Sequence, residues 1–170
     1  MHRARSNPRR RDELMPAGPR TSAFLICRSG TWLCALPLES VAETMRPQPI
    51  KVIADLPASV LGVAVIRAAM VPVVDISKLM GATAGTQPGR FVSLRLGTAR
   101  QVALAVGEVI GVQDLDIESL KRIPPLLRDT APDVIAAIAL LDAELLWVLQ
   151  TARLVPESLW SDIGAEVSPT

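Results

Sequence analysis

Few residues in this chain can perform acid–base, nucleophilic or metal chemistry, and their spacing argues against catalysis. The single histidine, His2, is the second residue, where a fraying chain end cannot hold an imidazole beside a nucleophile. Cys27 and Cys34 are the two cysteines, and two thiols without histidine support do not complete a zinc site. We expect both to be reduced core residues rather than a redox pair. The sequence predicts no catalytic residue and no metal site.

Motifs for nucleotides and nucleic acids are also missing from the sequence. There is no glycine-rich loop followed by Lys-Ser or Lys-Thr, and no G-x-G-x-x-G that opens a helix. The chain has no tyrosine, three tryptophans and two phenylalanines, too few for a platform on which bases stack. We therefore expect no cofactor and no nucleic-acid partner.

The composition is that of one globular domain or two small packed subdomains. The 170 residues are 49% hydrophobic and 21% charged, and a chain of this length buries about two thirds of its unfolded surface. The longest uncharged runs fall well short of the about 20 residues that cross a bilayer. No apolar signal segment follows the basic N-terminus. The expected location is cytoplasmic, without insertion into a membrane.

Charge is concentrated at the N-terminus. Residues 1–20 hold six arginines and two acids, a net +4, which leaves 12 basic and 15 acidic residues, a net −3, for the rest. Because residues 1–21 are rich in arginine and proline and poor in apolar residues, we expect a disordered basic tail. Such a tail is able to contact nucleic acid or anionic lipid, but a solvated leader without function is the simpler interpretation.

Two hairpins of the same pattern lie 67 or 68 residues apart. Each consists of two apolar runs around a tight turn, in which glycine relieves the positive dihedral angles of the turn. This correspondence indicates an internal duplication. The runs are residues 24–28 and 31–36 in the first hairpin and 91–96 and 100–106 in the second, and the matches include Phe24 with Phe91, Arg28 with Arg95, and Gly30 with Gly97.

The other segments predict further short strands. Residues 134–149 resemble a helix in composition, but Asp142-Ala143-Glu144 divides them into two strand lengths, so we interpret them as a hairpin. Many short strands separated by turns predict a mainly β fold with one small barrel in each half. The remaining predictions are a short helix over residues 38–45, strands over 56–66 and 70–76, a loop over 81–89, a closing helix over 151–159 and loose residues at the end.

One segment resembles a motif of the CheW family: Leu61-Gly-Val-Ala-Val-Ile-Arg-Ala-Ala-Met-Val-Pro-Val-Val-Asp-Ile76, against L-G-V-x-N-L-R-G-x-x-V-P-V-V-D-L in the family. The resemblance extends over about residues 22–155. It implies two SH3-like five-stranded β-barrels packed side by side, with short helices. It also implies a non-catalytic adaptor that couples the cytoplasmic tip of methyl-accepting chemoreceptors to the regulatory domain of a CheA-type histidine kinase, in arrays at the membrane.

The expected organisation follows from this resemblance. We divide the chain into a disordered basic tail over residues 1–21, a CheW-like domain over 22–155, and a C-terminal helix or loose tail over 156–170. Within the domain we expect one subdomain of about residues 22–80 plus a C-terminal return, and a second of about 90–150. The groove between the two barrels is the expected docking place.

The resemblance also implies which residues contact the receptor or the kinase: Val41, Glu43, Ile50, Gly62 and Arg67. Val41 would pack against a receptor helix or belong to the core, and Glu43 would be exposed at a helix end. Gly62 would allow close approach of a partner, or simply form a bulge. Ile50 would lie by the kinase-facing loop. Arg67 would order the groove, its alternative being a stabilising pair with an acid such as Asp75.

Two residues beside Arg67 depart from the family pattern. Val65 stands in place of asparagine and Ala68 in place of glycine. Asparagine supplies amide hydrogen bonds and glycine tolerates positive φ, so the departures suggest an altered turn. They leave open a CheW-like scaffold for another, non-flagellar chemosensory pathway. A small-barrel protein that binds nucleic acid through the basic tail is the more distant alternative.

Overall fold

The computed structural model describes residues 18–128 and 132–166, with side chains described up to residue 163. Its ten strands are β1 (Thr21–Ser29), β2 (Trp32–Pro37), β3 (Val41–Met45), β4 (Val60–Ile66), β5 (Ala69–Asp75), β6 (Arg90–Leu96), β7 (Arg100–Val106), β8 (Glu108–Asp116), β9 (Ile135–Leu141) and β10 (Glu144–Leu149). The helices are α1 (Ile76–Leu79) and α2 (Glu157–Glu166), and four 3₁₀ turns cover Leu38–Ser40, Ile117–Ser119, Pro125–Leu127 and Thr151–Arg153.

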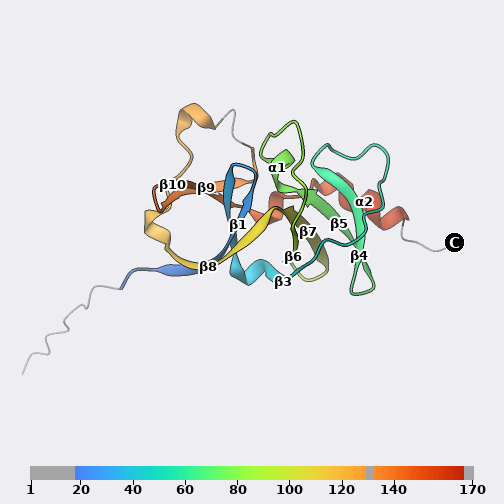
Figure 1. Cartoon of the computed structure of the whole chain (residues 1–170), viewed down its shortest axis with the longest axis horizontal. Helices are drawn as coiled ribbons and strands as arrows, with labels where there is room; N and C mark the ends of the chain where they lie inside the picture. The colour runs from blue at the N-terminus through green and yellow to red at the C-terminus, as the bar shows by residue number, and fades with distance from the viewer. Residues whose placement is uncertain (1–17, 129–131, 167–170) are drawn as a thin grey trace, which may run out of the picture.

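The strands form two five-stranded sheets (Figure 1). Sheet A has the order β8-β1-β2-β10-β9, and sheet B has the order β3-β6-β7-β5-β4. The prediction of a mainly β fold with two five-stranded units and few short helices is confirmed.

The two sheets repeat one topology. The hairpin β1–β2 in sheet A corresponds to β6–β7 in sheet B, and each has a parallel neighbour, β10 beside β2 and β5 beside β7. The matched residues Phe24 and Phe91 are each buried in the core inside their own sheet. The topology therefore supports the internal duplication that the hairpin pattern indicates.

The sheets are interleaved along the chain, which corrects the expected subdomain boundaries. Residues 41–75 share sheet B with residues 90–106, while residues 108–149 return to the first hairpin in sheet A. A division near residues 80–90 therefore cuts through sheet B. The prediction was wrong because the parallel pairs β2–β10 and β5–β7 join segments far apart in the sequence, and local patterns carry no information about such pairs.

The helix expected over residues 38–45 is also wrong. Leu38–Ser40 forms a single 3₁₀ turn, and Val41–Met45 is strand β3, paired antiparallel with β6. The apolar residues there fit helical spacing, but Val41 and Thr44 are β-branched and favour an extended backbone. Pairing with the edge of β6 decides between the two conformations.

Three apolar clusters hold the sheets. One fills the space between β1–β2 and β6–β7, and the other two lie inside sheets A and B. These four strands are buried on both faces, which explains why their sequences are continuous apolar runs rather than alternating ones. Cys27 and Cys34 are cross-strand neighbours in the cluster between the sheets, and burial raises the pKa of each thiol to about 12. Their thiolate forms are thus suppressed.

Each sheet curves until its two edge strands approach one another. In sheet B, the segment after β3 reaches β4 through two backbone hydrogen bonds between Lys51 and Val63, of 2.8 and 2.9 Å. In sheet A, the segment after β8 reaches β9 through the equivalent pair, Lys121 and Ile138. The strand ladders themselves do not close, so one isolated bridge spans the seam of each barrel-like sheet.

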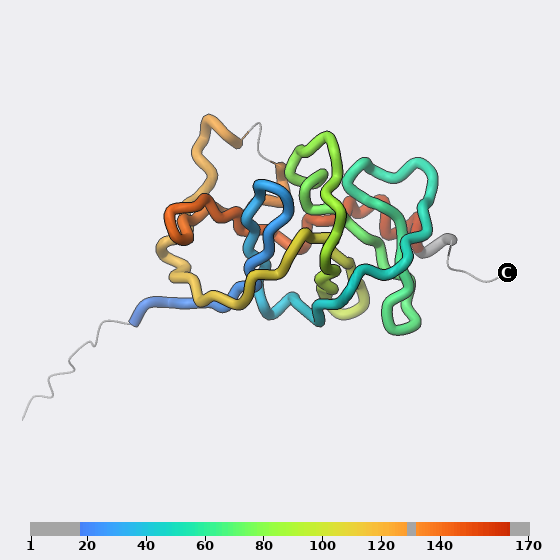
Figure 2. Tube along the Cα trace, in the orientation of Figure 1, coloured from blue at the N-terminus to red at the C-terminus, as the bar shows by residue number. Residues whose placement is uncertain are grey.

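The C-terminal segment crosses from sheet A to sheet B. Figure 2 shows the chain after β10, in orange to red, running to the side of sheet B where α2 lies. The hairpin expected over residues 134–149 is confirmed as β9–β10. The closing helix is displaced: a 3₁₀ turn occupies Thr151–Arg153, and α2 continues to Glu166, into residues expected to be loose.

Two expectations concern the ends of the chain and the membrane. The disordered tail was predicted over residues 1–21: residues 1–17 lie outside the described residues, whereas Thr21 already belongs to β1, so the tail cannot extend that far. Within the described part of the chain, neither helix has the length and apolar character needed to cross a membrane.

Candidate functional site

Glu43 and Arg67 form a bidentate ion pair at the seam of sheet B. Arg67 Nε donates to Glu43 Oε1 at 2.7 Å, and Arg67 Nη2 donates to Glu43 Oε2 at 2.8 Å. The predicted site residues Glu43 and Arg67 are thus brought into direct contact, although they are 24 positions apart. Parallel N–H···O bonds of this kind fix the plane of the guanidinium as well as its position.

The two elements that carry the pair are the edges of sheet B. Glu43 lies on β3 at a bulge opposite Ser93 of β6. Arg67 lies in the two-residue turn between β4 and β5, where Arg67 and Ala68 adopt φ of 48° and 64°. Paired positive φ values define the tight hairpin turn that matches strand twist. Ala68 therefore keeps the turn that a glycine would favour, at the steric cost of a Cβ in the left-handed region.

The pair is accessible to a partner. The Arg67 side chain is 79% exposed, whereas that of Glu43 is 29% exposed. The hydrogen bond from Arg67 lowers the pKa of Glu43, and the carboxylate in turn raises the pKa of Arg67. Both groups are therefore charged at neutral pH. An ion pair this exposed contributes little to folding, because water competes for both charges.

The expected partner of Arg67 in the alternative interpretation, Asp75, has a different role. Asp75 is buried at the start of α1, where its Oδ1 accepts hydrogen bonds from the backbone N–H groups of Ser77 and Lys78. This is an N-cap, which satisfies donors that the first turn of a helix leaves free. The structure thus assigns the arginine to Glu43 instead.

Gly62 and Ile50 are also brought together, but by packing within the chain. Gly62 is buried at a bulge of β4 with φ of 140°. A Cβ at this position would meet the carbonyl oxygen of Lys51 and would lie 2.9 Å from Ile50 Cγ2. Ile50 packs against the core inside sheet B. The close approach that glycine permits here is that of the chain's own 50–51 segment, which favours the bulge interpretation.

Val41 lies at the start of β3 and is half-buried. It is paired with Leu94 of β6 and packs against the cluster between the two sheets. Val109, which follows the second hairpin at the same 68-residue offset from Val41, is half-buried on β8 and pairs with Cys27. Part of the Val41 side chain therefore packs against the core, and the rest is exposed to solvent.

Two features escaped the sequence analysis. Arg28, at the end of β1, donates to both carboxylate oxygens of Glu144 at 2.6 and 2.8 Å, and its Nε lies 3.8 Å from Glu108. The sequence signal for this pair was Arg28 itself, a charged residue in the otherwise apolar strand β1 that needs a partner. Ile110 and Val112 on β8 are 50% and 54% exposed. No strand was predicted over Glu108–Asp116, whose sequence EVIGVQDLD has no regular apolar and polar alternation to indicate which side chains face outward.

Three Arg–Glu pairs should make folding stability depend on acidity. The guanidinium hydrogen bonds lower the pKa of Glu43, Glu144 and Glu157. A pKa lowered on folding stabilises the native state above the unfolded value of about 4.3, and this stabilisation is lost as the pH falls through the folded pKa. We expect the melting temperature to fall below about pH 4, measured by circular dichroism.

The control for this prediction is the triple variant Glu43→Gln, Glu144→Gln, Glu157→Gln. Near neutral pH its melting temperature should be lower than that of the parent. On acidification its melting temperature should fall by less than that of the parent. An acid-induced fall of the same size in both proteins would contradict the assignment to these pairs.

Comparison with known proteins gives one family and one fold. A family model described as CheW-like domain matches residues 23–158. Among solved structures, that of the scaffolding protein TtCheW from Thermoanaerobacter tengcongensis matches with a TM-score of 0.67 and 22% sequence identity, over 79% of this chain and 92% of that one. A comparison with curated protein sequences finds no match. The family model matches the sequence, and the solved structure matches the fold of the two sheets.

Proposed function

The chain belongs to the CheW family, a family of scaffolding proteins in chemotaxis signalling, and from this premise we propose that it couples methyl-accepting chemoreceptors to a CheA-type histidine kinase. It acts without catalysis, by binding the cytoplasmic tip of the receptor and the regulatory domain of the kinase. Its place is the cytoplasm, at receptor arrays on the membrane.

The Glu43–Arg67 pair carries this proposal. Glu43 engages Nε and Nη2 of Arg67, and among the described residues Nη1 makes no hydrogen bond. The guanidinium is therefore held in one orientation with a donor left for a partner's carboxylate or carbonyl oxygen. A pre-oriented donor loses little conformational freedom on binding, so more of its interaction energy contributes to affinity.

Apolar side chains around the pair supply the rest of the surface. Val65 precedes Arg67 by two positions on β4 and is 62% exposed, and Val41 lies two positions before Glu43 on β3. They are near the pair along the chain rather than on one strand face, because a bulge separates Val41 from Glu43 and Arg67 lies in the turn after β4. A mixed surface of this kind fits a helical partner that presents apolar side chains and an acceptor, as in helix-in-groove recognition.

Direct binding tests the proposal. The full chain is titrated in a calorimeter with a receptor signalling tip in helical-hairpin form and, separately, with a CheA regulatory domain. We expect saturable binding to both, in the micromolar range typical of transient signalling contacts. An absence of heat and of co-elution with both partners would refute the proposed function.

The departures at Val65 and Ala68 favour a second candidate, a scaffold for a non-flagellar chemosensory pathway. The exposed valine offers an apolar contact where the family presents an amide, so it favours a receptor tip with an apolar residue there. Val65→Asn should then shift preference toward receptor tips of flagellar systems. Equal affinities of parent and variant for both kinds of tip would remove this candidate.

A further inference from the structure

A chain of hydroxyl groups joins the two sheets. Ser29 is the last residue of β1 in sheet A, and Ser77 lies in α1, which continues directly from β5 of sheet B. Both side chains are buried, and their Oγ atoms are hydrogen-bonded at 2.7 Å. Ser77 Oγ is also hydrogen-bonded, at 2.9 Å, to Oγ1 of Thr86 in the loop before β6. We call Ser29, Ser77 and Thr86 the hydroxyl latch.

The backbone at both ends of the central bond is held by its own sheet. Asp75, the last residue of β5, accepts a hydrogen bond from the N–H of Ser77 at 2.8 Å, and the carbonyl oxygen of Ser77 accepts from Ala82 at 2.9 Å. Ser29 is held by the pairing of β1 with β2, where it lies opposite Trp32. The bond between the two serines therefore ties one sheet to the other.

The duplicated half of the molecule carries apolar residues at the equivalent positions. Ser29 corresponds to Leu96 at the offset of 67 residues. The left-handed turns before β5 and β10 begin at residues 67 and 142, which are 142 − 67 = 75 positions apart, so Ser77 corresponds to Ala152. Leu96 packs against the apolar cluster between the sheets. Because a buried hydroxyl pair adds little stability over apolar groups of the same shape, its distinct contribution is directional.

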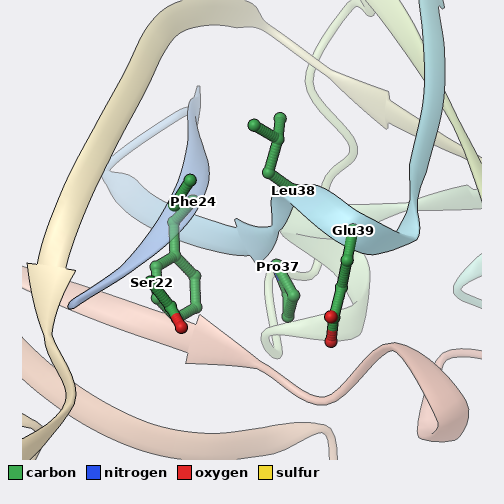
Figure 3. Close-up of a pocket in the computed structure, with 6 residues that line it drawn as sticks. Ser22, Phe24, Pro37, Leu38 and Glu39 are labelled. Atoms are coloured by element: carbon green, nitrogen blue, oxygen red, sulfur yellow. The ribbon is translucent and has the colours of Figure 1, made fainter. Parts of the chain in front are cut away.

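The backbone crossings between the sheets do not fix their relative orientation. The chain crosses at Gly107, between β7 and β8, and at the 3₁₀ turn Leu38–Ser40, between β2 and β3. Figure 3 shows that Leu38 points the opposite way from Pro37 and Glu39. A hollow of about 520 Å³ adjoins this second crossing, so packing around it is incomplete; its lining is Ser22, Ala23, Phe24, Pro37, Leu38 and Glu39.

The remaining contacts between the sheets are weakly directional. The apolar cluster between them favours burial but is indifferent to small rotations, because the hydrophobic effect has no direction. The hydroxyl groups of Ser40 and Thr151 also join the first crossing turn to the 3₁₀ turn after β10, but at 3.4 Å this bond is long and therefore weak. The short bonds of the hydroxyl latch are the stronger constraint on the angle between the sheets.

We propose that the hydroxyl latch sets the orientation of sheet A relative to sheet B, and that this orientation shapes the partner-binding surface around Val41. Val41 is paired with Leu94 in sheet B, but its side chain packs on the cluster that both sheets share. A rotation between the sheets therefore changes how much of Val41 a partner meets, whereas the Glu43–Arg67 pair lies within sheet B. The effect on binding rests on the proposed function, and the orientation itself does not.

Residual dipolar couplings of the backbone amides in the full chain test the orientation. For the parent we expect the couplings of both sheets to fit one alignment tensor. The double variant Ser29→Ala, Ser77→Ala removes the central bond without leaving one serine unpaired, and its two sheets should require tensors of different orientation. The single variant Ser77→Ala should give the same result, because both hydrogen bonds of the latch involve Ser77.

Ser93→Ala is the matched control. The Ser93 hydroxyl is as buried as those of Ser29 and Ser77, but it makes no hydrogen bond within the described structure. Its removal should leave one shared tensor with the parent orientation. If the couplings of the double variant also fit one tensor with the parent orientation, or if Ser93→Ala changes the orientation as much, the latch is overturned.

Calorimetric titration of the same variants with a receptor signalling tip and with a CheA regulatory domain tests the effect on binding. We expect the double variant to lose at least about threefold in affinity for the partner that contacts Val41, and Ser93→Ala to bind like the parent. Parent-like affinity of the double variant for both partners, despite a changed orientation, would overturn the link to the binding surface. If the parent itself bound neither partner, the proposed function would fail, and the tensors alone would decide whether the latch orients the sheets.

Discussion

Replacing Gly62 with aspartate is expected to unfold or strongly destabilise sheet B, with the loss of partner binding as a consequence. Two costs add at this position. A side chain at φ of 140° is strained, and its Cβ would collide with the backbone carbonyl of Lys51, which closes the seam with Val63. The aspartate would also bring a charge into a buried site.

The expected size is a loss of roughly 3 kcal/mol or more in the free energy of unfolding, or about 10 °C in melting temperature. Urea unfolding followed by tryptophan fluorescence measures it. Gly111→Ala on β8 is the matched control, because Gly111 has φ of 154° and a Cβ there would meet nothing within 4 Å. It should cost backbone strain only. If the Gly62→Asp variant unfolded like the parent, the close contact between the bulge at Gly62 and the carbonyl of Lys51 would be contradicted.

Replacing Arg67 with alanine is expected to have the opposite profile: an unchanged fold and weakened partner binding. The side chain is 79% exposed, and its ion pair with Glu43 spans the surface of the seam, so the core loses nothing. The partner loses the oriented guanidinium donor, and Glu43 loses the hydrogen bond that lowers its pKa. We expect affinity for the receptor tip or the kinase regulatory domain to fall at least about tenfold, measured by calorimetry.

Arg100→Ala is the matched control for this prediction. Arg100 forms an equally bidentate pair with Glu157, at 2.9 and 2.6 Å, and stacks on Trp160 at 5.2 Å. Its removal should loosen α2 without reducing partner affinity as Arg67→Ala does. Unchanged affinity of the Arg67→Ala variant for both partners would remove Arg67 from the binding surface, and equal losses in both variants would assign the effect to general surface charge.

The sequence alone predicted the local structure correctly where a turn separates two apolar runs. The hairpins around Gly30 and Gly97 and the hairpin β9–β10 follow from turns that interrupt runs of strand length. In each case the partner strand follows directly in the sequence, so the turn and both strands lie within one short contiguous segment. The motif from Leu61 to Ile76 carried the family for the same reason, because its residues are contiguous.

Strand β3 shows where local evidence fails. Val41 to Met45 fits a helical pattern, yet it pairs with β6, some fifty residues away in the chain. Helix formation and strand pairing differ little in free energy for such a short segment, so the available edge of β6 tips the balance. The subdomain boundary was misplaced for a related reason, since sheet B draws its strands from both sides of the loop at residues 81–89.

The candidate site divides in the same way. Residue type alone indicated that Arg67, a lone cation between apolar strands, needs a partner or solvent, and that Gly62 marks close backbone approach. That the partner is Glu43 rather than Asp75, and that the approaching backbone is the chain's own Lys51, depended on how the two edges of sheet B curve toward each other. Side-chain chemistry is a property of each residue, whereas the pairing of distant residues is a property of sheet curvature, which arises only when all five strands are assembled.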